Sequence, residues 1–385
     1  MMDNKIPKGY KNTEVGVIPV DWEVTALNKV LKIRHGKSQK EIEVVDGEYP
    51  ILGTGGEMGR TNTFLYNKPS VLIGRKGTID KPRYMNSPFW TVDTLFYSEL
   101  FNNVEPVFIY YNFLLVDWYS HNEASGVPSL NASKIEQIKI PLPPLPEQKA
   151  IATVLSDTDK LIQALEKKMA KKQLIKKGAM QDLLSPKDEW ERVKLDSVIE
   201  VSRGGSPRPI QDYTTLSLKG INWIKIGDTS PASKYITETK ERIILEGAQY
   251  SRKVEVGDFL LSNSMSFGRP YILKIDGCIH DGWLVLHNYR KSFDREFLYY
   301  TLISKDITNQ YLAKASGSGV LNLNKELVKT VMLNKPKSIK EQSRIAQILS
   351  DMDNELELLE KKLAKNKTIK QGLMQLLLTG QKRLV

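Results

Sequence analysis

The chain contains one long segment twice. Residues 147–185 return as residues 341–379 at a constant offset of 194 with no gap, and 21 of these 39 positions are identical. The identical pairs include Glu147/Glu341, Gln148/Gln342, Asp157/Asp351, Asp159/Asp353, Gly178/Gly372 and Met180/Met374. A weaker similarity joins residues 21–38 to 189–206 at an offset of 168. Because repeated sequences form repeated units, this pattern predicts the order globular region, helix, globular region, helix.

Apolar residues in both copies of the segment follow alternating spacings of four and three. A period of 3.5 residues is typical of two helices that wrap around each other with interlocking side chains. The predicted seam consists of Ile151, Leu155, Thr158, Ile162, Leu165 and Met169 in the first copy and Ile345, Leu349, Met352, Leu356, Leu359 and Leu363 in the second. A helix of about 38 residues would be roughly 57 Å long, which is too long to lie across one small core.

Two equivalent helices in one chain pack most simply about a pseudo-twofold axis, which makes them antiparallel. Duplex DNA has the same symmetry, so such a pair could place equivalent surfaces on two half-sites. It would also offer two copies of any outer docking surface. We therefore expect two identical partner chains. Gly178 and Gly372 are unusual inside a helix, and we interpret them as a fraying end or a close-packing position rather than a docking surface.

The regions between the helices are rich in short strand patterns separated by Gly and Ser. Strands are predicted at 30–36, 49–54, 70–79 and 89–97 in the first region, and at 197–205, 222–228, 257–264 and 282–287 in the second. Helices are predicted at 104–119 and 295–314. The fold class is thus α+β, with two strand-rich globular domains separated by two long helices that pack as an antiparallel coiled coil. The predicted boundaries are 1–146, 147–187, 188–337 and 338–385.

Charge and cysteine content limit the function classes. The formal net charge is +11, which permits a nucleic acid partner without establishing one. Cys278 is the only cysteine in the sequence, so no intramolecular disulfide can form. The first residues lack the basic and apolar regions of a signal peptide, and the sequence holds no apolar run long enough to span a membrane. We expect a cytoplasmic protein with no membrane partner.

Loops rich in Arg, Lys, Ser, Asn and Gly suit DNA recognition, because Arg pairs with guanine, Asn pairs with adenine and Gly admits a phosphate. Any surface loop is built from the same residues, so each candidate also has a purely structural interpretation. Candidates in the first region are Arg34, His35, Lys37, Ser38, Gln39, Arg60, Asn62, Arg75, Lys76, Lys81 and Arg83. Candidates in the second region are Arg203, Ser206, Arg208, Ser262, Asn263, Ser264, Ser266 and Arg269. Asp93 and Asp281, which correspond at an offset of 188, are interpreted as turn or hydrogen-bonding residues.

No residue pattern indicates a reaction centre. The four histidines are scattered without a second ligand at metal-binding spacing, so we predict no metal site. No phosphate-binding loop of the G-x-x-x-x-G-K-[ST] type is present. A nuclease-like pairing of Asp228 with residues 238–240 can be written, but Glu166-Lys167-Lys168 matches the same pattern inside the predicted coiled coil. We therefore predict no catalytic residue.

Four stretches of the repeated segment carry a family resemblance: IPLPPLPEQKAIATVLSDTDKLIQALEKK and KKGAMQDLLS in the first copy, and EQSRIAQILSDMDNELELLEKKL and KQGLMQLLLTG in the second. In these stretches the chain resembles the specificity subunit of Type I restriction-modification enzymes. The resemblance covers the whole length, since that family alternates two target recognition domains with two helical regions. WERVKLDSVIEVSRGGSP and GDFLLSNSMSFGRP also resemble its recognition domains. One departure is NKPKSIKEQ, which lacks the proline cluster before the second helix.

The resemblance implies a protein that catalyses nothing itself. Each recognition domain would bind one half of a bipartite double-stranded DNA target, while the helices set the spacer and dock two methylation subunits. S-adenosylmethionine, ATP and Mg would belong to partner subunits, which include restriction and translocation subunits. Two other interpretations stay open from the residues alone: a free-standing nuclease that uses Asp228, and a coiled-coil scaffold that binds only proteins.

Overall fold

The computed structural model describes residues 6–230, 233–263, 268–315 and 323–384. Contacts divide the chain into two compact units, and each contains one globular region together with parts of both long helices. The first unit consists of residues 1–167 and 361–385, and the second of residues 168–360. These units cut across the four boundaries expected from the sequence, which remain a prediction.

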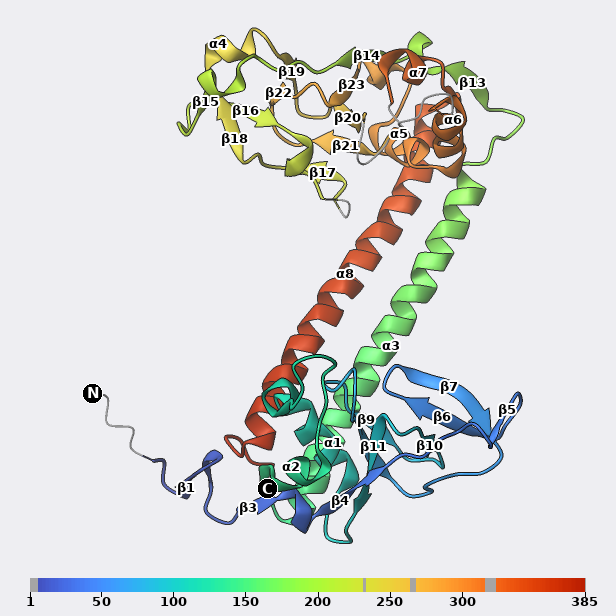
Figure 1. Ribbon diagram of the computed structural model, residues 1–385. Helices are drawn as coiled ribbons and strands as arrows, with labels where there is room; N and C mark the ends of the chain where they lie inside the picture. The colour runs from blue at the N-terminus through green and yellow to red at the C-terminus, as the bar shows by residue number, and fades with distance from the viewer. Residues whose placement is uncertain (1–5, 231–232, 264–267, 316–322, 385) are drawn as a thin grey trace. The chain divides into compact units, whose positions relative to one another are not determined.

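The described part of the first unit contains two four-stranded sheets and the two-stranded sheets β1-β2 and β12-β3 (Figure 1). Its early elements are β1 (Tyr10–Thr13), β2 (Gly16–Pro19), β3 (Glu23–Ala26), η1 (Leu27–Lys29), β4 (Leu31–His35), β5 (Glu43–Val44), β6 (Tyr49–Gly53), β7 (Gly56–Thr61) and β8 (Ser70–Gly74). The later elements are β9 (Arg83–Met85), β10 (Trp90–Thr91), β11 (Leu95–Leu100), α1 (Pro106–Leu115), η2 (Trp118–His121), α2 (Ala132–Gln137) and β12 (Lys139–Leu142).

One four-stranded sheet of this unit has the order β4-β11-β8-β9, and the other has the order β10-β6-β7-β5. In the second of these, β6 pairs with β10 in parallel and with β7 in antiparallel register. Figure 1 shows this sheet on the side of the unit away from α1 and α2. Helix α1 instead contacts β8 and β9 of the first sheet. The loops of the β10-β6-β7-β5 sheet are therefore displayed away from the helical core.

The second unit repeats this plan with longer loops. Its first elements are β13 (Glu191–Lys194), η3 (Leu195–Ser197), β14 (Glu200–Arg203), η4 (Ile210–Asp212), β15 (Thr214–Thr215), β16 (Ile221–Ile224), η5 (Ile226–Asp228), β17 (Tyr235–Ile236), β18 (Glu241–Ile243), α4 (Leu245–Ala248) and β19 (Arg252–Val254). They are followed by β20 (Phe259–Ser262), β21 (Pro270–Leu273), β22 (Gly277–Ile279), β23 (Trp283–His287), η6 (Tyr289–Lys291), α5 (Arg295–Leu302), α6 (Lys305–Ala315), α7 (Lys325–Lys329) and β24 (Met332–Lys335).

The two five-stranded sheets of the second unit have the orders β14-β23-β20-β21-β17 and β15-β18-β16-β22-β19, and β13 pairs with β24 in a two-stranded sheet. Strand β16 pairs with β22 in parallel and with β18 in antiparallel register, and β15 pairs with β18. This is the topology of β6, β10, β7 and β5 in the first unit. Figure 1 shows β15, β16 and β18 on the side of the unit away from α5, α6 and α7. The segment predicted as one helix at 295–314 is two helices, α5 and α6, interrupted at Ile303 and Ser304.

Both long helices follow a short strand and are anchored at their first turn by a buried glutamine. Helix α3 (Leu145–Leu183) follows β12, and α8 (Ile339–Leu378) follows β24. The Gln148 side chain accepts a hydrogen bond from the Glu105 N–H at 2.9 Å and donates to the Pro143 carbonyl at 2.9 Å. Gln342 does the same with the Asp294 N–H at 2.9 Å and the Pro336 carbonyl at 3.0 Å. The missing proline cluster therefore does not change how α8 begins.

Within each unit, the parts of α3 and α8 run antiparallel and are joined by ion pairs. In the first unit, Asp159 pairs with Lys370 at 2.6 Å and Glu166 with Lys367 at 2.7 Å. In the second unit, Lys172 pairs with Glu355 at 2.8 Å and Lys176 with Asp353. In each unit, the partner number falls as the residue number rises. Asp159–Lys370 and Asp353–Lys176 are equivalent pairs under the offset of 194.

A core tyrosine completes each of these equivalent pairs. The Tyr111 hydroxyl of α1 donates to Asp159 at 2.7 Å, and the Lys370 ammonium lies 5.5 Å from the Tyr111 ring centroid. The Tyr300 hydroxyl of α5 donates to Asp353 at 2.5 Å, and the Lys176 ammonium lies 5.9 Å from that ring centroid. Burial, together with the acceptor carboxylate, raises the pKa of both tyrosines above its ordinary value. We call each group a Tyr–Asp–Lys cluster.

The residues of the predicted seam are not equally buried. Ile151, Leu155, Ile345 and Leu349 are almost fully buried and belong to the cores that also contain α1 or α5. Side chains at the other seam positions are less enclosed: Ile162, Leu165, Leu359 and Leu363 are 7–8% exposed, whereas Met169 and Leu356 are half-buried. The helix ends thus contribute to the globular cores. No helix among the described residues is both long and apolar enough to cross a membrane.

The position of Leu349 gives a direct test of which face of α8 is buried. Leu349 is 0% exposed in the second core, whereas Leu358 on the same helix is 66% exposed. We expect Leu349→Ala to lower the free energy of unfolding by about 2–5 kcal/mol, because it removes buried apolar contacts and leaves a cavity. Leu358→Ala should change it by less than about 0.5 kcal/mol. Denaturation in urea measures both, and equal losses would contradict this placement of α8.

Candidate nucleic-acid interface

The first candidates of the first unit lie at the end of β4 and in the loop that follows. Arg34 pairs with Glu99 at 2.8 Å, and this carboxylate raises the pKa of the Arg34 guanidinium above its ordinary value. The His35 ring packs edge-on against Phe96, with centroids 4.9 Å apart. Lys37 and Ser38 are exposed, and Gln39 is half-buried. Arg34 and His35 are exposed as well, but their side chains already contact Glu99 and Phe96, whereas Lys37 makes no ion pair among the described residues.

Three arginines of the first unit hold backbone carbonyls in place. Arg60 donates to the carbonyls of Gly47 at 2.7 Å and Glu48 at 2.9 Å, and it also pairs with Glu57. Arg83 donates to the carbonyls of Gly53 and Thr54, and Arg75 donates to the carbonyl of Asp93 at 3.1 Å. Arg60 and Arg83 therefore shape the loops around β6 and β7, and Arg75 holds the turn between β10 and β11.

The remaining candidates of this unit have simpler surroundings. Asn62 accepts a hydrogen bond from the Glu48 N–H at 3.2 Å, and Lys76 and Lys81 are exposed. A cavity of about 520 Å³ lies beside the β6–β7 loop. It is lined by Gln39, residues 53–58 and residues 92–94, so Gln39 is the candidate that borders it.

Candidates of the second unit converge on one residue, Asp281, through its backbone carbonyl and its carboxylate. Arg203 and Asn263 donate to its backbone carbonyl at 3.2 and 3.3 Å. Ser206 donates to the Asp281 Oδ1 atom at 3.0 Å, and Arg208 lies 3.5 Å from Oδ2. Residues from β14, from the loop after it and from the loop after β20 are thereby brought together around the turn before β23.

The charge of Asp281 is stabilised by its neighbours. Burial disfavours the charged form, but His280, Ser206 and Arg203 outweigh this effect and hold the pKa of Asp281 below its usual range. The His280 Nε2 atom lies 2.9 Å from Oδ1. Asp281 is therefore ionised at neutral pH, and its oxygens are occupied as acceptors. This agrees with the hydrogen-bonding role that the sequence predicts for it.

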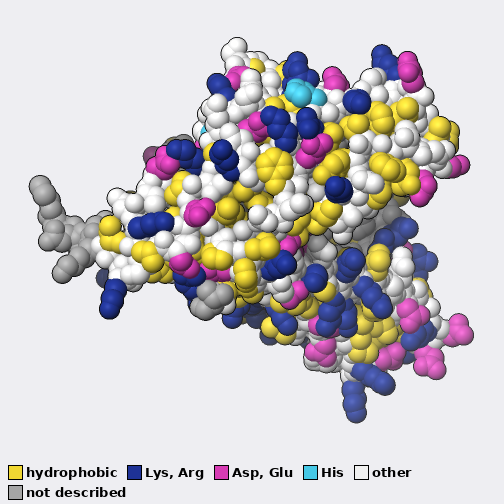
Figure 2. All heavy atoms as spheres, turned by 90° about the horizontal axis from the view of Figure 1, so that it is seen from below, with side chains coloured by type: hydrophobic (Ala, Val, Ile, Leu, Met, Phe, Trp, Pro, Cys, Tyr) yellow, Lys and Arg dark blue, Asp and Glu magenta, His cyan; other side chains and the backbone are white. Residues whose placement is uncertain are grey.

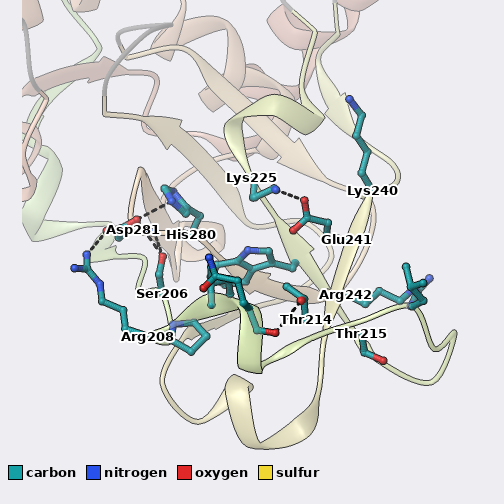
Figure 3. Close-up of a pocket in the computed structure, with 15 residues that line it drawn as sticks. Ser206, Arg208, Thr214, Thr215, Lys225, Lys240, Glu241, Arg242, His280 and Asp281 are labelled. Carbon is teal, nitrogen blue, oxygen red and sulfur yellow. Dashed lines mark hydrogen bonds and ion pairs between the residues drawn. The ribbon is translucent and has the colours of Figure 1, made fainter.

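A cavity of about 730 Å³ opens beside Asp281 (Figure 3). Figure 3 shows Ser206, Arg208, His280 and Asp281 on one side of the cavity and the ion pair of Lys225 with Glu241 on another. The complete lining is Ser206, Pro207, Arg208, Ile210, Gln211, Thr214, Thr215, Leu216, Trp223, Lys225, Lys240, Glu241, Arg242, His280 and Asp281.

The cavity lining includes Lys225, Lys240 and Arg242, which are not among the candidates predicted from the sequence. Lys240 and Arg242 flank the start of β18, a three-residue strand too short to give a clear alternating pattern. Their only sequence signal is the alternation of charge in Lys240-Glu241-Arg242. The Arg242 guanidinium donates to the Gly220 carbonyl at 3.0 Å, and Lys240 makes no ion pair with any residue that the structure describes.

The last group of candidates lies around β20 and β21. Ser262 is buried, and Asn263 is 8% exposed. The Arg269 guanidinium carbon lies 5.7 Å from the Tyr271 ring centroid, and its buried Nε atom has no hydrogen-bond partner among the described residues. Ser264 and Ser266 lie outside the described residues. Ser262 and Asn263 are thus enclosed by protein.

The nuclease-like pairing of Asp228 has a structural explanation. Its carboxylate accepts hydrogen bonds from the backbone N–H groups of Lys225 at 2.8 Å and Lys240 at 3.3 Å. It therefore closes the turn at η5. In the portion of the chain that the structure describes, no three His, Cys, Asp or Glu residues are grouped so that they could bind a metal ion.

On the face shown in Figure 2, Lys and Arg side chains are interspersed with Asp and Glu. A polyanion would therefore be bound by local clusters, such as the cations around the cavity beside Asp281.

Comparison with known proteins places the chain in a family. Residues 19–177 and 187–368 match the family described as Type I restriction modification DNA specificity domain. The type I restriction enzyme MjaVIII specificity subunit of Methanocaldococcus jannaschii is 26% identical, covering 95% of this chain and 94% of the relative. The type I restriction enzyme EcoDI specificity subunit of Escherichia coli is 23% identical, covering 76% and 73%.

Solved structures show the same fold. The S subunit of a type I restriction-modification system from M. genitalium superposes with a TM-score of 0.63 at 16% identity, covering 98% of both chains. A second solved structure is described as the structural basis of complex assembly and conformational transition of the type I R-M system. One of its chains superposes with a TM-score of 0.59 at 15% identity, covering 95% of this chain and 99% of that one. The chain belongs to the type I restriction-modification specificity subunit family, whose members are non-catalytic recognition components.

Proposed function

We propose that the chain recognises a bipartite double-stranded DNA target, with residues 1–146 binding one half-site and residues 188–337 the other. The repeated topology of β5, β6, β7 and β10 in β15, β18, β16 and β22 supports this proposal. The same framework carries different loops in the two units. Residues 147–187 and 338–385 would set the spacer between the half-sites. Phosphate contacts would supply affinity, and a few contacts to base edges would supply specificity.

The helices would also dock two methylation subunits. One exposed stripe is identical in both copies: Lys168, Lys171, Ile175 and Gly178 recur as Lys362, Lys365, Ile369 and Gly372. Ile175 and Ile369 are 45% and 43% exposed, and a side chain at Gly178 or Gly372 would meet nothing within 4 Å among the described residues. Glycine inside a helix costs about 1 kcal/mol. The sequence favoured a fraying end or a close-packing position for these glycines, but the open space around them supports a partner that packs closely on this stripe, which would explain why the cost occurs twice.

In such an assembly, S-adenosylmethionine would lie on the methylation subunits, and ATP with Mg on restriction and translocation subunits. The contribution of this chain would be recognition and spacing. An assembly of this kind acts on DNA in the cytoplasm, where we propose that the chain resides.

The modular proposal predicts the outcome of a domain exchange. Replacing residues 188–337 with the corresponding region of another specificity subunit should change one half-site and leave the other unchanged. The methylated adenines in host DNA, mapped by sequencing, report both half-sites. Replacing residues 1–146 is the matched control, which should change the other half-site only. A change in both half-sites after either exchange would contradict the proposal.

The spacer proposal predicts the effect of lengthening both helices. Insertion of seven residues at equivalent positions of α3 and α8 keeps the seam in phase and adds about 10 Å. At about 3.4 Å per base pair, the spacer between the methylated half-sites should grow by about three base pairs, with both half-sites retained. Insertion in α3 alone is the control and should prevent assembly. An unchanged spacer in the doubly extended protein would refute this role.

The docking proposal predicts stepwise loss of methylation subunits. Ile175→Asp or Ile369→Asp alone should reduce the complex from two methylation subunits to one, because each introduces a charge into one docking face. The double variant should bind none. Native mass spectrometry measures these stoichiometries. Leu358→Asp is the control, because Leu358 is 66% exposed and its counterpart in the first copy is Ala164, so the position is not shared by the repeat; this variant should retain both subunits. Full occupancy in the double variant would exclude this stripe.

A further inference from the structure

Two leucines at the loop between β15 and β16 project fully into solvent. The Leu216 and Leu218 side chains are 101% and 86% exposed. Single exposed apolar residues are normal on a protein surface. Two that are almost completely exposed and two positions apart form an apolar tip, and such features mark contact sites. We call residues 215–220 the leucine tip.

Hydrogen bonds within the leucine tip keep it ordered. The Ser217 N–H donates to the Thr215 hydroxyl at 3.1 Å, and the Lys219 N–H donates to the Ser217 hydroxyl at 3.3 Å. The Gly220 N–H donates to the Ser217 carbonyl at 2.9 Å. A Cβ atom at Gly220 would lie 2.6 Å from a Thr215 methyl carbon and 3.0 Å from the Arg242 Cβ atom. The close packing at Gly220 thus fixes the base of the tip while the leucines point outward.

The leucine tip borders the cavity beside Asp281, and Leu216 is part of its lining. That lining carries four cationic side chains against two carboxylates: Arg208, Lys225, Lys240 and Arg242 against Glu241 and Asp281. Lys219 adds a further exposed cation at the tip itself. Lys240 makes no ion pair among the described residues, and Arg208 is 83% exposed. The surroundings of the two leucines are therefore complementary to phosphate.

We propose that the leucine tip enters a groove of the duplex, where Leu216 and Leu218 contact the apolar edges of bases while Arg208, Lys240 and Lys219 contact phosphates. This rests on the proposed DNA recognition function and assigns a contact element to its second half-site. Strands β15 and β16, which the tip connects, lie on either side of β18. The major groove is about 12 Å wide, and apolar side chains there contact thymine methyl groups. The fixed turn would lower the ordering cost of binding.

The equivalent loop of the first unit is different. Strand β5 corresponds to β15, and the residue after it, Val45, is 92% exposed. Asp46 and Glu48 lie beside Val45 in the sequence, and their charges would repel phosphate. The proposal is therefore limited to the second unit, and it predicts that the two half-sites are bound by chemically different tips.

The test uses the full chain assembled with its methylation subunits. The probes are a duplex with both half-sites, as mapped from methylated adenines in host DNA, and a duplex with the second half-site scrambled. Fluorescence anisotropy gives each Kd at several salt concentrations. The L216S/L218S variant should lose roughly 10- to 100-fold affinity for the intact target, because it loses apolar burial. Its salt dependence should stay as in the parent complex.

The R208Q/K240Q variant should instead reduce the salt dependence of binding, because it removes phosphate contacts.

Leu312→Ser is the matched control, because Leu312 is 43% exposed on α6, away from the tip within the same unit. It should bind as the parent complex does.

If the parent complex prefers the intact target and L216S/L218S binds it equally well, the leucine tip proposal is overturned and the recognition function stands. If the parent complex shows no preference, the recognition function itself fails, and the tip proposal fails with it. If L216S/L218S no longer assembles with methylation subunits, the tip is a protein-docking element and the proposal is wrong.

Discussion

The Tyr–Asp–Lys cluster is the interaction on which the rest of the structure depends. It joins three elements in each unit: a core helix, the first half of one long helix and the second half of the other. Asp159 accepts from Tyr111 and pairs with Lys370, and Asp353 accepts from Tyr300 and pairs with Lys176. A carboxylate with both a hydroxyl donor and an ammonium partner is well compensated for its partial burial. The cluster therefore fixes the register of the two helices relative to each globular core.

Each long helix supplies both kinds of residue. Helix α3 contributes Asp159 to the first unit and Lys176 to the second, and α8 contributes Asp353 to the second and Lys370 to the first. The aspartate and the lysine are 17 positions apart in each copy, and both are identical in the repeat. A shift of one helix by a single turn would break both clusters together. Because each copy of the repeated helix contains both the aspartate and the lysine, the two copies can pair reciprocally only when they run antiparallel.

Much of this architecture could be predicted from the sequence because it is periodic. The repeat and the heptad spacing predict the two long helices. Together with the strand patterns between them, the helices predict the α+β fold class. The sequence could not predict that Gln148 and Gln342 anchor the helix starts, since a polar residue near a helix start is usually exposed. Short strands such as β15 and β18 were also missed, because two or three residues give no alternation. These strands nevertheless position Lys225, Lys240 and Arg242 around the cavity.

The candidate DNA-binding residues show why composition alone cannot assign function. Arg60 and Arg83 have the side chain most suited to guanine, yet both donate to backbone carbonyls of their own loops. The exposed cation Lys240 was not among the candidates. An arginine that is hydrogen-bonded within the fold shapes a loop, whereas an unpaired cation beside a cavity is available to a ligand. The distinction depends on backbone placement, which residue type does not determine.

The repeat is also incomplete, and the difference shows what the residues after α8 contribute. In the first unit, the buried carboxylate of Glu147 accepts from the Trp22 indole at 2.9 Å and from Arg383, which also pairs with Asp21 at 2.9 Å. In the second unit, the buried indole N–H of Trp190 has no partner among the described residues. At the offset of 194, the position equivalent to Arg383 holds Glu189, so Arg383 has no counterpart after α3. A glutamate side chain that is 1% exposed requires such a partner. Arg383 therefore belongs to the first core and is not part of a loose tail.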